Sequence, residues 1–137
     1  MEITVDTAEG AVPVTILRIQ GDLDSSSFQL LIDKAAEVCD AGAKHLVIDM
    51  SGVPFMGSAG LVALYSVAKL AKGQESARQG AGGDWNAYPA MGATRDKTQR
   101  NVKLLGVQEQ VQGVLDVSGM AAYFEIHCDL DEAVASF

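Results

Sequence analysis

The sequence is poor in cysteine and in long apolar runs, and each shortage excludes a class of protein. It has only two cysteines, Cys39 and Cys128, and no basic segment followed by an apolar stretch opens it. We therefore expect no secretory signal and two reduced thiols, as in a cytoplasmic protein. No apolar run approaches the roughly 20 residues that a membrane-spanning helix needs, so we expect a soluble chain without a membrane span.

Positive charge is also scarce. The 137 residues include 10 lysines and arginines against 18 aspartates and glutamates, which gives a formal net charge of −8. Such a balance repels phosphate backbones, and we expect no direct nucleic-acid partner. The acidic charge is consistent with plain solubility and also with a basic protein partner, and composition alone leaves both open.

The hydrophobic pattern predicts one α/β domain over residues 1–137. Strand-like segments alternate with segments of helical periodicity in the order β-β-α-β-α-loop-β-α-β-α. This order predicts a mixed sheet of four to five strands with about four helices packed against it. The expected strands cover residues 1–5, 12–20, 45–50, 101–107 and 123–128, and the expected helices cover 25–40, 58–73, 108–119 and 129–137.

Residues that begin and end helices support this assignment. Serines from Ser25 onward are expected to cap the first helix, and Gly42 supplies its left-handed exit. Asp129 and Glu132 have the spacing of a capping box at the last helix. The second helix is apolar on most of its circumference, so we expect it to be buried on more than one side or to contact a partner.

Residues 74–101 differ from the rest of the chain. They contain a glycine cluster, the single tryptophan Trp85, Tyr88, Met91 and a charged end. We interpret them as a long insertion after the second helix. Because a purely flexible linker would rarely carry such apolar groups, we expect the insertion to pack against a neighbouring element.

Ser58 follows an apolar strand in the stretch VPFMGSAG and has three possible roles: nucleophile, phosphate acceptor or helix cap. A nucleophile elbow needs glycine two residues before the serine, where this chain has Met56. Asp116 and His127 follow Ser58 in the order of a hydrolase triad, but His127 falls in the middle of an expected strand, on the same face as Glu125. A structural or surface histidine is therefore the preferred interpretation over a serine hydrolase.

No metal or cofactor site is expected. His127 and Cys128 are adjacent in a strand and point to opposite faces, and no second pair of ligands has suitable spacing. The glycines of residues 80–83 are not followed by a lysine-serine pair, so a phosphate-binding loop is a weak alternative to a linker.

A longer string places Ser58 in a known context. The stretch VIDMSGVPFMGSAGLVALYSVAKLAK resembles the signature of the STAS domain of anti-sigma factor antagonists, in which a strand leads through S-G-V-x-F-M to an exposed serine that opens a helix. The GDLD turn, residues 21–24, is similar to the family's turn before the first helix, and LLGVQEQVQGVLDVSGM is similar to its later strand and helix.

The resemblance implies a regulatory protein rather than an enzyme. Members bind an anti-sigma factor that is also a serine kinase; the kinase phosphorylates the serine, the complex dissociates, and a phosphatase resets it. Ser58 matches the phosphate acceptor. Many members have aspartate immediately before this serine, whereas this chain has Gly57, which removes a carboxylate. The alternative is a constitutive STAS subunit of a transporter-associated or stress-signalling complex, with Ser58 only capping its helix.

The expected partner surface joins two loops. The GDLD turn and the Ser58 loop, residues 53–57, both leave strand ends where helices begin, so we expect them at one end of the sheet. The resulting surface, on a monomer or weak dimer, would include Asp22, Asp24, Gly57, Ser58, Ala59 and Gly60. The neutral hydroxyl of Ser58 would become strongly negative on phosphorylation.

Overall fold

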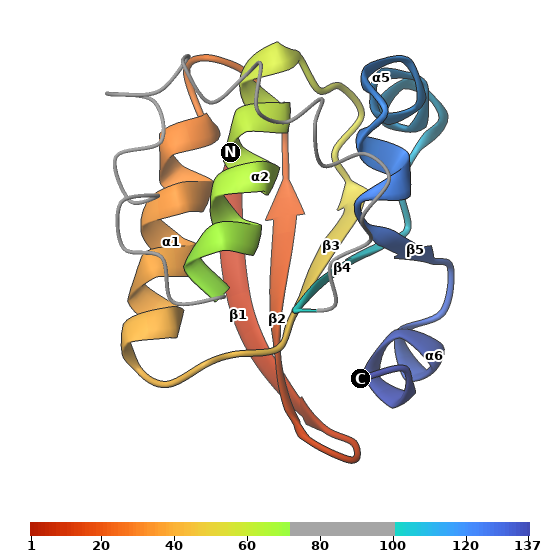
Figure 1. Cartoon of the computed structure of the whole chain (residues 1–137). Helices are drawn as coiled ribbons and strands as arrows, with labels where there is room; N and C mark the ends of the chain where they lie inside the picture. Colours follow the sequence, from red (N-terminus) through yellow and green to blue (C-terminus); the bar gives the residue numbers. More distant parts are fainter. Residues whose placement is uncertain (72–100) are drawn as a thin grey trace.

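A computed structural model describes residues 1–71 and 101–137 (Figure 1). The expected insertion, apart from Asn101, lies outside the described residues. Five strands form one sheet: β1 (Glu2–Glu9), β2 (Pro13–Gln20), β3 (Leu46–Gly52), β4 (Val102–Leu105) and β5 (Glu125–His127). The helices are α1 (Phe28–Asp40), α2 (Ser58–Ala71), α5 (Glu109–Ser118) and α6 (Leu130–Ala135), with a short 3-10 turn, η3, at Met120–Ala122. The predicted order of elements and the mixed α/β class are confirmed.

The strands lie in the order β1-β2-β3-β4-β5. β1 runs antiparallel to β2, and the other neighbouring pairs are parallel. The carboxyl ends of β2, β3 and β4 therefore meet at one edge of the sheet. The connections to α1, α2 and α5 leave from this edge, which is where open α/β sheets place their binding sites.

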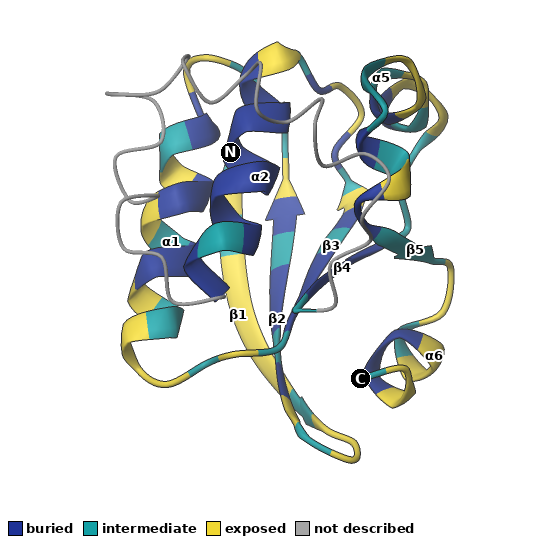
Figure 2. Ribbon diagram, in the orientation of Figure 1, coloured by how far each residue is buried: buried dark blue, intermediate teal, exposed yellow. Residues whose placement is uncertain are grey.

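Helices cover both faces of the sheet, and alternate strand residues point to opposite sides. The larger core lies on the face covered by α1, α2 and α5 (Figure 2). A smaller core on the other face joins β2, β3 and β4 to α6. β3 contributes to both, since Leu46 and Ile48 belong to the first and Val47 to the second. This double burial explains why three consecutive residues of the strand, Leu46–Ile48, are apolar.

Two helix ends differ in detail from the prediction. α1 begins at Phe28 and not at Ser25. Ser27 occupies the N-cap position, but its hydroxyl donates to the carbonyl oxygen of Asp22 at 2.7 Å and makes no capping bond to the helix. Asp129 is the N-cap of α6, as predicted, but its carboxylate accepts from the amide of Asp131 at 2.9 Å and not, as in the predicted capping box, from the amide of Glu132. Gly42 has the predicted left-handed conformation, with φ of 108°.

No helix within residues 1–71 or 101–137 has the length and apolar character required to cross a membrane.

Candidate functional site

Ser58 is the exposed first residue of a helix that is otherwise almost wholly buried. Of the 14 residues of α2, only Ser58 and Lys69 are not buried, which confirms the expected burial of this helix. The apolar circumference of α2 thus holds the helix in place, while its first hydroxyl remains accessible. Amides in the first turn of a helix lack intrahelical partners and can favour a negative charge there.

The GDLD turn and the Ser58 loop lie side by side, as predicted. Leu23 pairs with Met56 in an isolated parallel bridge. The amide of Leu23 donates to the carbonyl oxygen of Phe55 at 3.0 Å, and the amide of Gly57 donates to the carbonyl oxygen of Leu23 at 3.1 Å. Backbone hydrogen bonds therefore couple the position of Ser58 to the turn that follows β2.

The two aspartates of the GDLD turn have different surroundings. The Asp24 carboxylate accepts from the hydroxyl of Ser26 at 2.6 Å and from its amide at 3.0 Å. These hydrogen bonds, first the one from the hydroxyl, lower the pKa of Asp24 below its usual value. Asp22 is exposed, and its backbone carbonyl oxygen, not its carboxylate, accepts from the hydroxyl of Ser27. Asp24 thus organises the turn, whereas the Asp22 side chain faces solvent.

Small residues surround Ser58 for different reasons. Among the described residues, a Cβ added at Gly57 would meet only one atom within 4 Å, the Cε1 of Phe55 at 3.8 Å, so their packing does not require glycine there. Gly60 is buried, and an added Cβ would overlap Met56 Cγ and lie 2.8 Å from its Sδ. Ala59 is only 3% exposed. Ala59 and Gly60 therefore pack the first turn of α2 against the domain, and their contact with a partner stays a prediction.

A residue that the sequence did not single out holds the Ser58 loop from the other side. The side-chain oxygen of Gln110, on α5, accepts from the amide of Met56 at 2.9 Å. Its side-chain nitrogen donates to the carbonyl oxygen of Met56 at 3.4 Å. Gln110 is 54 residues from Met56 in the chain, so no local pattern could have identified this contact.

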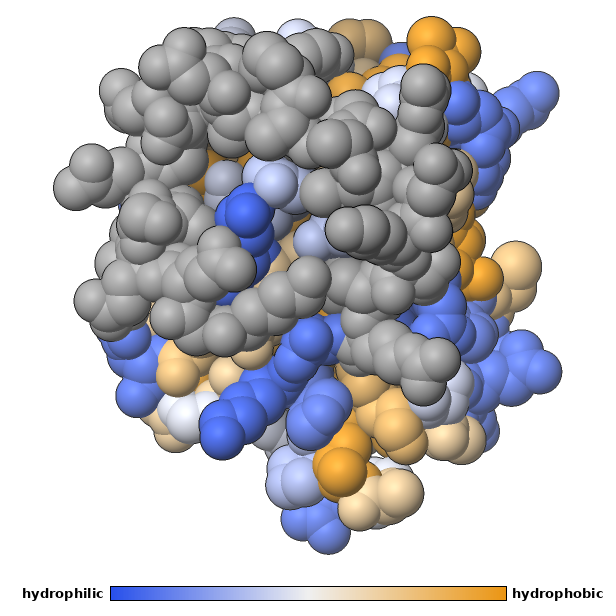
Figure 3. Space-filling model, viewed as in Figure 1, coloured by the Kyte–Doolittle hydropathy of each residue, from blue (hydrophilic) through white to orange (hydrophobic). Residues whose placement is uncertain are grey.

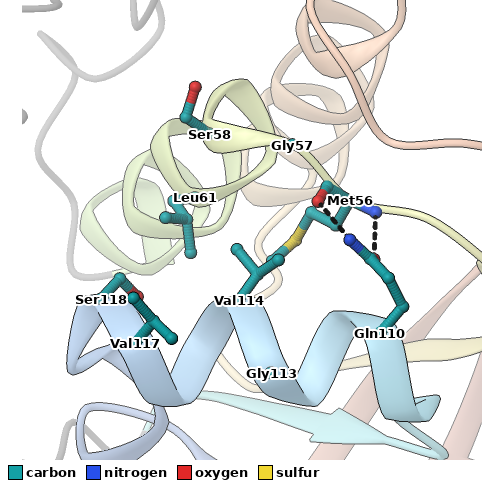
Figure 4. A pocket seen from close by; sticks show the side chains of 9 residues that line it. All are labelled: Met56, Gly57, Ser58, Leu61, Gln110, Gly113, Val114, Val117 and Ser118. Carbon is teal, nitrogen blue, oxygen red and sulfur yellow. Dashed lines mark hydrogen bonds between the residues drawn. The ribbon is translucent and has the colours of Figure 1, made fainter.

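Between α2 and α5 lies an open groove of about 550 Å³, here called the α2–α5 groove (Figure 4). Leu61 and Val114 point toward each other across it, while the Ser58 hydroxyl points away from α5 at its rim. The groove is lined by Met56, Gly57, Ser58, Leu61, Gln110, Gly113, Val114, Val117 and Ser118. Ser58 is thus bordered by an apolar depression to which α5, absent from the predicted site, contributes most residues.

The residues of the alternative hydrolase are not assembled. Nε2 of His127 lies 3.5 Å from Oε1 of Glu125 on the same face of β5, as the sequence predicted. The Asp116 carboxylate accepts from the side-chain nitrogen of Gln112 at 2.9 Å. Neither His127 nor Asp116 lines the groove beside Ser58. In the described part of the chain, no three histidine, cysteine or acidic residues are grouped as metal ligands.

Residues 2–76 match the family of the STAS domain, which is more than half of the chain. The chain belongs to the STAS domain family. The match includes the GDLD turn, the Ser58 loop and α2, and the extent of a single STAS domain over residues 1–137 stays a prediction. No curated protein matches the sequence.

Several solved structures share the fold of this chain at low sequence identity. A proposed anti-sigma factor antagonist from Thermotoga maritima superposes with a TM-score of 0.70 at 16% identity, over 98% of this chain and 92% of that one. The Bacillus cell fate determinant SpoIIAA in its phosphorylated form has a TM-score of 0.53 at 15% identity, over 98% of each chain. A sulfate transporter family protein from Wolinella succinogenes has 0.53 at 19%, over 90% of this chain and 83% of that one. Identities this low establish the common STAS fold alone.

Proposed function

We propose that this STAS protein is a bacterial anti-sigma factor antagonist, which binds a kinase-like anti-sigma factor and is released when Ser58 is phosphorylated. The observation that carries the proposal is the exposed Ser58 at the head of the buried helix α2, on loops that are hydrogen-bonded to each other. The protein acts by binding, in the cytoplasm, and catalyses nothing itself. A serine phosphatase would contact it transiently to restore the hydroxyl.

The phosphoryl transfer uses ATP held by the kinase. The Oγ of Ser58 forms a bond to the γ-phosphorus as the bond from that phosphorus to the β-phosphate bridging oxygen breaks, and ADP leaves. The hydroxyl proton passes to a base of the kinase. The product carries about −2 charge in place of a neutral hydroxyl.

The position of Ser58 suits a switch because two requirements are met together. A phosphate at the start of α2 is tolerated by the helix dipole and the first-turn amides, so the modified protein stays folded. In an interface built for a neutral hydroxyl the same phosphate must lose water, and each 1.4 kcal/mol of uncompensated cost weakens binding about tenfold. A few kcal/mol therefore dissociate a micromolar complex.

The second candidate is a constitutive STAS subunit of a transporter-associated or stress-signalling complex. Gly57 favours it, since the residue before Ser58 carries no carboxylate to orient the hydroxyl or a nucleotide-bound magnesium ion. The fold similarity to a sulfate transporter family protein points the same way. In this case the only role of Ser58 would be to cap its helix.

Substitutions at Ser58 separate the two functions. Each serine-kinase-type anti-sigma factor of the source organism is purified, and its affinity for the protein is measured by calorimetry with and without ATP. We expect Ser58→Ala to bind as the parent does and to resist release by ATP, while Ser58→Asp binds at least tenfold more weakly with an unchanged melting temperature. Mass spectrometry locates any added phosphate.

The matched control is Thr7→Asp, which also replaces a hydroxyl with a carboxylate. Thr7 is exposed on β1 and pairs with Thr15 near the start of β2, so it lies at the opposite end of the sheet from Ser58. This variant should bind as the parent does. Tight binding without phosphate on Ser58, together with unweakened binding of Ser58→Asp, refutes the switch and supports the constitutive subunit.

A further inference from the structure

The α2–α5 groove is an apolar surface that nothing in the described chain fills. Val117, on its lining, is 91% exposed, although it is a large apolar residue. Figure 3 shows strongly hydrophobic surface at the upper right, where α5 lies in Figure 1. The side chains of Leu61 and Val114 face the same space (Figure 4). Contiguous apolar surface of this kind, bordered by polar groups, marks interaction sites.

Gly113 gives a second, independent indication. It lies in the interior of α5 and lines the groove, yet an added Cβ would have no atom of residues 1–71 or 101–137 within 4 Å, and its φ is not positive. Glycine at such a position weakens a helix relative to alanine. Neither packing nor backbone conformation within the described chain requires it. A partner that approaches the backbone of α5 closely would explain why no side chain is present at this position.

The charges around the groove indicate the chemistry of the occupant. Asp22 and Asp24 lie in the turn beside the Leu23–Met56 bridge, and Glu109 and Asp116 are exposed on α5, although none of these four carboxylates lines the groove itself. α5 carries no basic residue, and the single basic residue of α2 is Lys69 in its last turn. An apolar segment with basic residues beside it therefore complements this surface.

We propose that the α2–α5 groove receives an apolar side chain, flanked by basic residues, from the kinase-like anti-sigma factor, and so forms the second half of the partner surface beside Ser58. This inference rests on the proposed function. Because the Ser58 hydroxyl stands at the rim of the groove, one partner can cover both. The groove then anchors the partner, and the charge state of Ser58 decides whether it stays.

The test uses the full chain and the purified kinase-like anti-sigma factors, with affinity measured by calorimetry. Val117→Asp places a charge in the groove at a residue too exposed to affect folding. Gly113→Leu fills the space beside α5 and should raise the melting temperature by a few degrees, since leucine favours a helix more than glycine does. We expect each variant to weaken binding at least tenfold, or 1.4 kcal/mol.

The matched control is Val5→Asp, which changes a 44% exposed valine on the edge strand β1 away from the groove. It should bind as the parent does. If a kinase binds the parent and Ser58→Asp weakens that complex, but Val117→Asp and Gly113→Leu bind with parental affinity, the groove inference is overturned and the proposed function stands. If neither substitution changes kinase binding but Val117→Asp abolishes self-association, a second copy is the occupant and the inference is also overturned. If no kinase binds the parent, both proposals fail.

Discussion

Replacing Gln110 with alanine should loosen the Ser58 loop and destabilise the fold, although Gln110 itself is exposed. Its side chain makes two hydrogen bonds with the backbone of Met56, at 2.9 Å to the amide and 3.4 Å to the carbonyl oxygen. Met56 has 0% of its surface exposed. Alanine would therefore leave a buried amide without its partner.

The magnitude follows from the two bonds. An unsatisfied buried donor costs about 1–3 kcal/mol, and the longer second bond contributes little by comparison. We expect Gln110→Ala to lower the free energy of unfolding by about 1–2 kcal/mol, which is about 3–8 °C in melting temperature for a chain of this length. Gln110→Glu keeps an acceptor for the amide and loses only the donor, so it should cost less than half as much.

Urea unfolding gives the free energies, and hydrogen exchange at the Met56 amide reports the loop directly. Gln112→Ala is the matched control, because this glutamine of the same helix only donates to the carboxylate of Asp116 at 2.9 Å. Such an i,i+4 pair is worth about 0.2–0.5 kcal/mol. If Gln110→Ala and Gln112→Ala lose equal stability and the Met56 amide keeps its protection, water replaces Gln110 and the reasoning is wrong.

Three further substitutions test other parts of the structure. Gly57→Asp should raise the initial rate of phosphorylation by the kinase, because it restores a carboxylate beside Ser58, and it should leave the melting temperature unchanged, because the new side chain has room. Mass spectrometry measures the rate at which phosphate is added, and a rate equal to or lower than that of the parent contradicts this. Gly60→Ala should cost about 1–3 kcal/mol in thermal unfolding, since the added carbon overlaps the buried Met56, and a parental melting temperature would remove the packing argument. Glu125→Gln removes an ion pair of 2.9 Å with Lys103, which lowers the pKa of Glu125 from its ordinary 4.5. That stabilisation is present above pH 4.5 and is lost as the pH falls through the lowered pKa. Parent and variant melting temperatures should therefore differ at pH 7 and converge once the pH lies below that pKa; a difference that stays constant as the pH is lowered refutes it.

The order of elements could be read from the sequence because each element is recorded in local periodicity. The buried strand β3 opens with the apolar run Leu46–Ile48, and α1 repeats its apolar residues at helical spacing. Ser58 was placed correctly at the start of a helix because the change of period occurs there. The resemblance of the Ser58 loop and the GDLD turn to the STAS signature then indicated the family. Parallel strands explain why both loops meet at one edge.

Other features depend on contacts between distant parts of the chain, which leave no local pattern. Polar side chains such as Gln110 have many possible partners, and only the packing of α5 beside the Ser58 loop selects the backbone of Met56. The same packing forms the α2–α5 groove from residues that periodicity shows only as parts of two helices. The sequence by itself determined the elements, the family and the exposed serine, because these follow from neighbouring residues. Tertiary structure decided what lies beside that serine, because side-chain partners across 54 residues are set by how the helices pack on the sheet.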